Sequence, residues 1–130
     1  MTPKVTGLKL KQGSKVLEVQ FDNGDHFVLA CELLRVCSPS AEVHGHGNPV
    51  LVTNKKEVNI TRIEPVGNYA VKLVFDDGHD SGLYSWKVLH DLGRNQDQHW
   101  ADYLARLKAA KGSREALIPL NVQFFDPDKK

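Results

Sequence analysis

The stretch that decides the fold is residues 75–86, which read FDDGHDSGLYSW. Its Asp77-Gly78 pair is typical of a type I′ turn, because both central residues of that turn need a positive φ. Before the turn, the residues at positions 71, 73 and 75 are apolar and fall on one face, with Lys72 between the first two. This alternation is the pattern of a half-buried strand, so the segment predicts a β-hairpin.

The second half of the stretch predicts how the hairpin joins a helix. We expect His79 to be exposed at the mouth of the hairpin and Gly82 to permit a bend. Ser85 is a plausible N-cap for a short helix that begins at Trp86 and ends at Gly93. Serine accepts a hydrogen bond from the first turn of a helix, and glycine favours the position just after one.

A weaker copy of this pattern lies 54 positions earlier in the chain. On that shift the apolar positions 17, 19 and 21 fall on 71, 73 and 75, and the turn at 22–24 falls on 76–78. Further matches place Gly13 on Gly67, Leu29 on Leu83, and Cys31 on Ser85. We infer two packed β-β-β-α units, and hence an α+β fold with a mainly antiparallel sheet. The alternative is that any two Phe-Asp-x-Gly hairpins look alike.

The other elements follow from alternation and from turn residues. We expect strands at residues 5–10, 17–21, 27–29, 58–63 and 69–75, a turn at 65–68 and a short helix at 32–36. A loop is expected at 38–49, where His46 has a glycine on each side. Asp97 is expected to cap a helix over 97–111 that Gly112 closes. The apolar stripe of that helix consists of Trp100, Tyr103, Leu104 and Leu107.

Length, charge and cysteine usage exclude several classes of protein. A chain of 130 residues predicts one domain over 1–112, with a C-terminal tail over 113–130. The formal net charge of +1 argues against binding nucleic acid or an anionic membrane. No apolar run approaches membrane-spanning length, and the N-terminus lacks the layout of a signal peptide. Cys31 and Cys37 fall on one short helix or its exit, which predicts no disulfide and a reducing, cytoplasmic location.

Several short motifs together resemble one known family. They are LLRV at 33–36, SPSAEV at 38–43, GHG at 45–47, EPVGNY at 64–69, FDDGH at 75–79 and YSW at 84–86. In combination they look like the gamma-butyrobetaine hydroxylase-like N-terminal domain family, long catalogued only as a domain of unknown function. The resemblance covers roughly residues 5–95. It implies a domain that in some proteins precedes an iron- and 2-oxoglutarate-dependent catalytic domain and in others follows an iron–sulfur carrier ATPase. Stand-alone bacterial members have no assigned activity.

The resemblance also implies a zinc site, which this sequence does not preserve. In the hydroxylases the domain holds structural zinc through three cysteines and one histidine. The histidine falls on His79, and the cysteines fall on Ser38, Ser40 and Val43. Serine hydroxyls are poor zinc ligands and valine is none, so this site is not expected to form. No hydroxylase activity follows from the resemblance either, because these 130 residues do not contain the catalytic domain.

A different metal site is the alternative hypothesis for function. Its candidate ligands are His79, His46, Cys37 and His44, with Asp77 or Asp80 nearby. A thiolate and imidazoles suit zinc or iron. Each residue also has a structural interpretation. Cys37 is more often a small buried hydrophobe, His44 is expected to be solvated, and His79 is expected to hydrogen-bond Asp77 or Asp80.

Catalysis has less support. The chain contains no nucleophile elbow, P-loop, dinucleotide fingerprint or His-Glu-x-x-His motif. A Cys37 nucleophile with His46 as base would lack an oxyanion hole and a third orienting group. The preferred interpretation is a non-enzymatic accessory or interaction domain with no cofactor, a protein partner of unknown identity, and a monomeric or weakly dimeric state. Its candidate interaction or structural motif comprises Asp77, Gly78, Gly82, Tyr84 and Trp86.

The C-terminal tail is apolar for a terminus, with the runs at 117–120 and 124–125. We expect it to cover the open sheet edge of its own domain, or else to offer a strand to a partner or a second copy. Coverage within the chain is the default, because exposed apolar segments are a liability.

Overall fold

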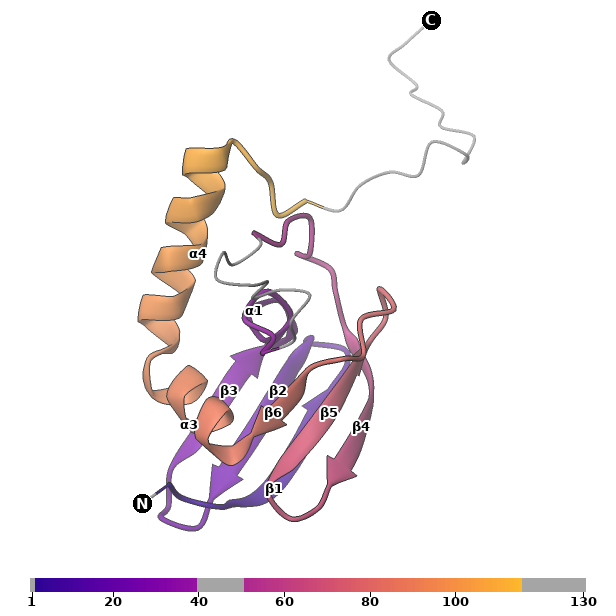
Figure 1. The fold of residues 1–130 in the computed structure, drawn as a ribbon, viewed down its shortest axis with the longest axis vertical. Helices are drawn as coiled ribbons and strands as arrows, with labels where there is room; N and C mark the ends of the chain where they lie inside the picture. The colour runs from indigo at the N-terminus through magenta and orange to yellow at the C-terminus, as the bar shows by residue number, and fades with distance from the viewer. Residues whose placement is uncertain (1, 40–50, 116–130) are drawn as a thin grey trace, which may run out of the picture.

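Two β-β-β-α units and one added helix make up the computed structural model, which describes residues 2–39 and 51–115 (Figure 1). The first unit contains β1 (Val5–Lys11), β2 (Val16–Phe21), β3 (His26–Ala30) and α1 (Cys31–Val36). The second contains β4 (Ile60–Val66), β5 (Ala70–Phe75), β6 (Leu83–Ser85) and α3 (Trp86–Arg94), and is followed by α4 (Gln96–Ala110). The α+β prediction is therefore confirmed. The expectations for Ser40, Val43, His44, His46 and the tail beyond residue 115 lie outside the described residues.

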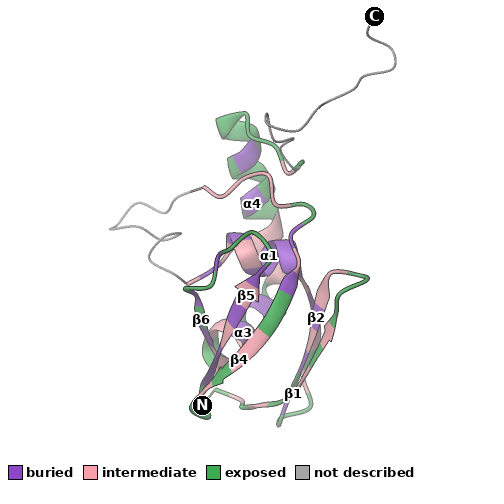
Figure 2. Cartoon of the chain, turned by 90° about the vertical axis from the view of Figure 1, so that its right-hand side faces the viewer, coloured by how far each residue is buried: buried purple, intermediate pink, exposed green. Residues whose placement is uncertain are grey.

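Each unit forms its own three-stranded antiparallel sheet, in the orders β1-β2-β3 and β4-β5-β6. The two sheets face each other across the core, with α1 lying across one end (Figure 2). α3 contacts β3 and β6, and α4 contacts α1 and α3. The central strands β2 and β5 thus place their apolar faces toward each other's sheets, which explains why positions 17, 19 and 21 of β2 and 71, 73 and 75 of β5 are apolar and buried.

The repeat extends to individual hydrogen bonds. The Phe21 N–H donates to the Asp25 carbonyl over 2.9 Å, and 54 residues later the Phe75 N–H donates to the His79 carbonyl over 2.9 Å. Each first strand also carries a register irregularity one residue after it begins, between positions 5 and 7 in β1 and between 60 and 62 in β4. The inference of two similar units is therefore confirmed in backbone detail.

The predicted type I′ turn at Asp77-Gly78 is wrong, and the first hairpin has the same turn as the second. Within the described segments, the non-glycine residues with positive φ lie at positions 15, 54 and 111, so Asn23 and Asp77 do not adopt that conformation. Gly24 and Gly78 alone supply the left-handed residue, with φ of 93° and 92°. Such a three-residue loop, with glycine last, is the next commonest hairpin after the two-residue turns. The Asp77 carboxylate instead accepts the N–H of His79 over 3.0 Å, which fixes the turn from its side chain.

A single cluster of buried side chains joins both sheets to α1 and α3. Leu17 on β2 and Leu73 on β5 are both 0% exposed. A second, smaller cluster seats α4 against the end of α1 through Val36, Tyr103 and Leu107. The predicted stripe of α4 is only partly correct, because Leu104 is exposed.

Helix ends depart from the sequence expectations in three places. Ser85 is the N-cap of α3 as predicted, and its Oγ accepts the N–H of Val88 over 3.2 Å. However, α3 continues through Gly93 to Arg94. Asp97 lies in the first turn of α4 and is not its cap, because the helix begins one residue earlier. At the other end of α4 the left-handed residue is Lys111, and the Gly112 N–H closes the turn by donating to the Leu107 carbonyl over 2.8 Å.

Gly93 is required by packing. A Cβ at this position would overlap the aromatic ring of Phe27, which crosses α3 there. We expect Gly93→Ala to lower the free energy of unfolding by about 1–2 kcal/mol, because the cost of overpacking exceeds the gain in helix propensity. A Cβ on Gly13 meets nothing within 4 Å, so Gly13→Ala is the matched control and should change stability by less than about 0.5 kcal/mol. Urea unfolding followed by tryptophan fluorescence measures both, and equal stabilities for the two variants would refute the packing argument.

Candidate functional site

His79 lies in the interior, so the expectation of an exposed histidine is wrong. Only 5% of the residue is exposed, and its Nε2 lies 2.9 Å from the Oγ of Ser38, which is 0% exposed. The β5–β6 hairpin brings His79 against the segment that leaves α1, and this long-range contact has no signature in the local sequence. The predicted hydrogen bond to Asp77 is present, but it is made by the backbone N–H of His79.

The structure thus brings together two of the positions that the family resemblance assigned to zinc. The remaining two, Ser40 and Val43, lie outside the described residues. Ser38 Oγ and His79 Nε2 contact each other directly, and a serine hydroxyl is a poor ligand. In residues 2–39 and 51–115, no group of three histidine, cysteine, aspartate or glutamate side chains could hold a metal ion. The described donor set therefore does not fit the family's zinc.

Two of the four candidate ligands of the replacement metal site, Cys37 and His79, lie among the described residues. Cys37 lines a groove beside α3 and α4, whereas the His79 ring contacts Ser38. His44 and His46 lie outside the described residues, so a zinc or iron site that uses them stays a prediction.

Tyr84 and Gly82 hold the hairpin against α1. Tyr84 is 0% exposed, and its hydroxyl donates to the carbonyl of Leu34. Burial raises the pKa of this phenol above its ordinary range. A Cβ on Gly82 would overlap Ser38 Oγ, so the glycine permits a close approach between the two segments. Tyr84 is therefore not available to a partner. Trp86 is half-buried, and its ring Nε1–H donates a hydrogen bond to the carbonyl of Asn68 over 2.8 Å.

Asp77 connects the hairpin to two cations. Its carboxylate lies 2.8 Å from Arg35 Nε on α1 and 2.7 Å from Lys55 Nζ. Burial alone would raise the pKa of Asp77, but hydrogen bonds from Lys55, the His79 N–H and Arg35 outweigh it and lower the pKa to about 2. The Asp77-Gly78 turn thus locks the second unit to the first, which is a structural contribution.

Stability should depend on pH through Asp77. A carboxyl whose pKa is lower in the folded state stabilises the fold above its unfolded pKa, and that contribution is lost as pH falls through the folded value. We expect Asp77→Asn to cost about 1–2 kcal/mol at pH 7, after allowance for solvent screening of the ion pairs. The difference from the wild type should shrink between about pH 4 and pH 2. Urea unfolding at pH 7, 4 and 2.5 measures it, and a difference that stayed constant across this range would contradict the assignment.

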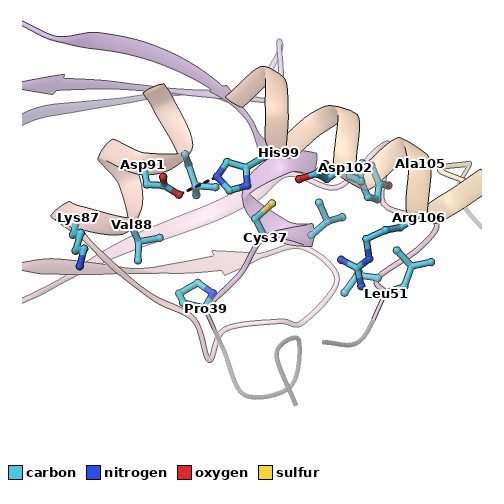
Figure 3. Close-up of a pocket in the computed structure, with 14 residues that line it drawn as sticks. Cys37, Pro39, Leu51, Lys87, Val88, Asp91, His99, Asp102, Ala105 and Arg106 are labelled. Carbon is cyan, nitrogen blue, oxygen red and sulfur yellow. Dashed lines mark hydrogen bonds and ion pairs between the residues drawn. The ribbon is translucent and has the colours of Figure 1, made fainter. Parts of the chain in front are cut away.

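A groove of about 920 Å³ lies between the end of α1, residues 51–52, α3 and α4 (Figure 3). Most of its lining is apolar and includes Val36, Leu51, Val52, Val88, Leu92 and Tyr103. Charged side chains also line it, namely Lys87 and Asp91 from α3 and Asp102 and Arg106 from α4. This combination of an apolar surface with a few charges is typical of a binding site.

Cys37, His99 and Asp91 all line this groove, and the His99 Nε2 lies 2.9 Å from an Asp91 carboxylate oxygen (Figure 3). Burial raises the pKa of the Cys37 thiol to about 11, only partly opposed by Arg106. The thiol is therefore protonated at neutral pH and is not an activated nucleophile. The arrangement does not support a cysteine hydrolase.

Cys37 could be identified from the sequence, but the groove could not. Most of its other lining residues lie on α3 and α4, for which the sequence predicted no common surface. The available signal was Val88, whose side chain is only partly buried on a helix that already buries Leu89 and Leu92. A helix with apolar side chains on two faces is expected to contact two surfaces.

The fold defines a small two-repeat α+β domain, and its described residues form a helix-lined groove. The chain belongs to the gamma-butyrobetaine hydroxylase-like, N-terminal family, whose model matches residues 8–90. The family resemblance is thereby confirmed. No described helix is long and apolar enough to span a membrane. Both cysteines are free.

Solved structures with the same fold extend the comparison. An NMR solution structure of a protein 72% identical to this chain covers 96% of it and 95% of that protein, with a TM-score of 0.78. A second NMR structure, 45% identical, covers 96% of this chain and 100% of that one with a TM-score of 0.80. A crystal structure of a protein of unknown function in the DUF971 family, from Acidithiobacillus ferrooxidans ATCC 23270, is 34% identical and has a TM-score of 0.60. It covers 69% of this chain and 92% of that one. No curated protein matches the chain.

Proposed function

We propose that this chain is a non-enzymatic, cytoplasmic accessory domain that binds a protein partner in the groove between α1, α3 and α4. The observation that carries the proposal is the largely apolar lining of that groove, in a domain whose other described polar clusters are taken up by internal hydrogen bonds. The thiol of Cys37 in the groove is protonated at neutral pH, which favours binding over catalysis.

The partner segment that fits is a helix with one apolar face. Two neighbouring helices, α3 and α4, form the sides of the groove, and a helix laid between them would bury its apolar stripe in the manner of helix-in-groove recognition. Charged side chains line both sides of the groove, Lys87 from α3 and Asp102 and Arg106 from α4, whereas the Asp91 carboxylate is already hydrogen-bonded to His99. Charges of both signs on the polar flanks of the partner helix would therefore be complemented.

Two alanines on α4 provide a matched test. Ala105 lines the groove and Ala110 does not, and both are exposed. We expect the wild type and Ala110→Arg to capture the same protein from a lysate of the source cell, while Ala105→Arg loses it. A synthetic helix from that protein should bind the wild type at least about tenfold more tightly than Ala105→Arg, a loss of about 1.4 kcal/mol. Melting temperatures confirm that both variants fold. Equal capture by both variants, or no specific capture by the wild type, would refute the proposal.

A further inference from the structure

We infer that residues 116–125 of the same chain occupy this groove and compete with the partner. Self-occupation rests on the same groove as the proposed function and would regulate partner binding there. It is measured by the reactivity of Cys37 without any partner, so self-occupation and partner binding can fail separately.

The described chain ends at residue 115, hydrogen-bonded to residues 54–56, which closely follow the groove-lining Leu51 and Val52. The Asn54 N–H donates to the Ser113 carbonyl over 2.7 Å, and the Lys56 N–H donates to the Arg114 carbonyl over 2.8 Å. The side-chain amide of Asn54 then donates to the Glu115 carbonyl over 2.7 Å. Because Asn54 follows Val52 by two residues, the last described residue is anchored within about 10–14 Å of the groove lining.

A buried ion pair fixes this departure point. Arg114 donates from Nε and Nη2 to the two carboxylate oxygens of Glu32, each over 2.8 Å, and Glu32 is only 5% exposed. The Tyr103 hydroxyl donates to the same carboxylate over 2.9 Å, and Tyr103 also lines the groove. The Arg114 guanidinium further lies 4.9 Å from the ring centroid of Trp100. The segment at 113–115 is therefore attached to α1 and α4, the same helices that form the groove.

The following ten residues have the chemistry and the length to fill it. They read ALIPLNVQFF, in which Asn121 and Gln123 are the only polar side chains. Fully extended, ten residues span about 33 Å. Pro119 disfavours a helix in this segment, since it lacks an N–H and restricts the residue before it. An apolar segment tethered near an apolar groove has a high effective concentration there, so occupancy by the chain's own segment is favoured over occupancy by a second copy.

Cys37 provides a direct probe of occupancy, because it lines the groove while Cys31 is 0% exposed. The test uses the full chain. Leu120→Glu combined with Phe124→Glu places charges on apolar tail positions, and Asn121→Glu with Gln123→Glu adds the same charges at polar positions. We expect the first pair to raise the rate of Cys37 alkylation by a maleimide about tenfold. This is the change expected if the groove is open about one-tenth of the time in the wild type and always open in the variant. The control pair should react at the wild-type rate.

Three outcomes decide the inference. Alkylation that is equally fast in all three proteins would overturn it. Protection of Cys37 that grows with protein concentration would also overturn it, because it would assign the occupant to a second copy. Protection that is independent of concentration and lost only in the apolar pair would support it. If the rates do not differ while Ala105→Arg still loses the captured protein, self-occupation fails and the proposed function stands.

Discussion

Replacing Leu73 with alanine is expected to lower the free energy of unfolding by about 2–5 kcal/mol, and Leu17→Ala should cost a similar amount. Both side chains are fully buried, one on the central strand of each sheet, and both belong to one core cluster. Each deletion leaves a cavity that the facing sheet cannot fill without moving. Because the cluster joins the two units, either variant should weaken both sheets in a single transition.

Urea unfolding and native-state hydrogen exchange test this prediction. Val28→Ala on β3 is the control, since Val28 is 44% exposed and its loss should cost less than about 0.5 kcal/mol. If Leu17→Ala increased amide exchange in β1–β3 alone and left β4–β6 protected, the two units would be independent folding units, against the prediction of one domain.

Arg114→Met is expected to be the second most damaging change, at about 2–4 kcal/mol. The Glu32 carboxylate is only 5% exposed, and without Arg114 its remaining hydrogen-bond donor among the described residues is the Tyr103 hydroxyl. Glu32→Gln should cost less, about 1–2 kcal/mol, because the neutral amide still accepts from Tyr103 and because Arg114, whose side chain is 34% exposed, can turn to water.

The order of the two costs is the informative result. Thermal and urea unfolding of the two variants, each in the full chain, give it directly. If Glu32→Gln were the more destabilising of the two, the larger cost would lie in leaving Arg114 without its carboxylate, which would contradict the assignment of Glu32 as the buried charge that needs compensation.

The architecture was predictable because it depends on local patterns. Apolar residues on one face of β2 and of β5, a glycine in each hairpin loop and Ser85 before α3 each have a short-range physical cause. The repeat at 54 positions then implied two similar units without any knowledge of their packing. The first strands and the helices of the two units are related by 55 positions, one more than the hairpins between them.

The site was less predictable because it depends on contacts between distant segments. His79 is buried by Ser38, 41 residues away, and Gly93 is a glycine because Phe27 crosses it. The turn type was misjudged because Asp77 uses its side chain to bind the next N–H, a choice that an Asp-Gly pair leaves open. The groove arises from α4 meeting α1 and α3, and helical periodicity alone does not give that crossing.

The central claim is that a partner helix lies between α3 and α4. Site-specific photo-crosslinking tests it most directly, with p-benzoylphenylalanine placed at Ala105 in the groove or at Val28 on β3, which is exposed and outside it. The account predicts an intermolecular adduct from position 105 that maps to an amphipathic helix of the partner, and none from position 28. Adducts from position 28 with none from position 105 would contradict it.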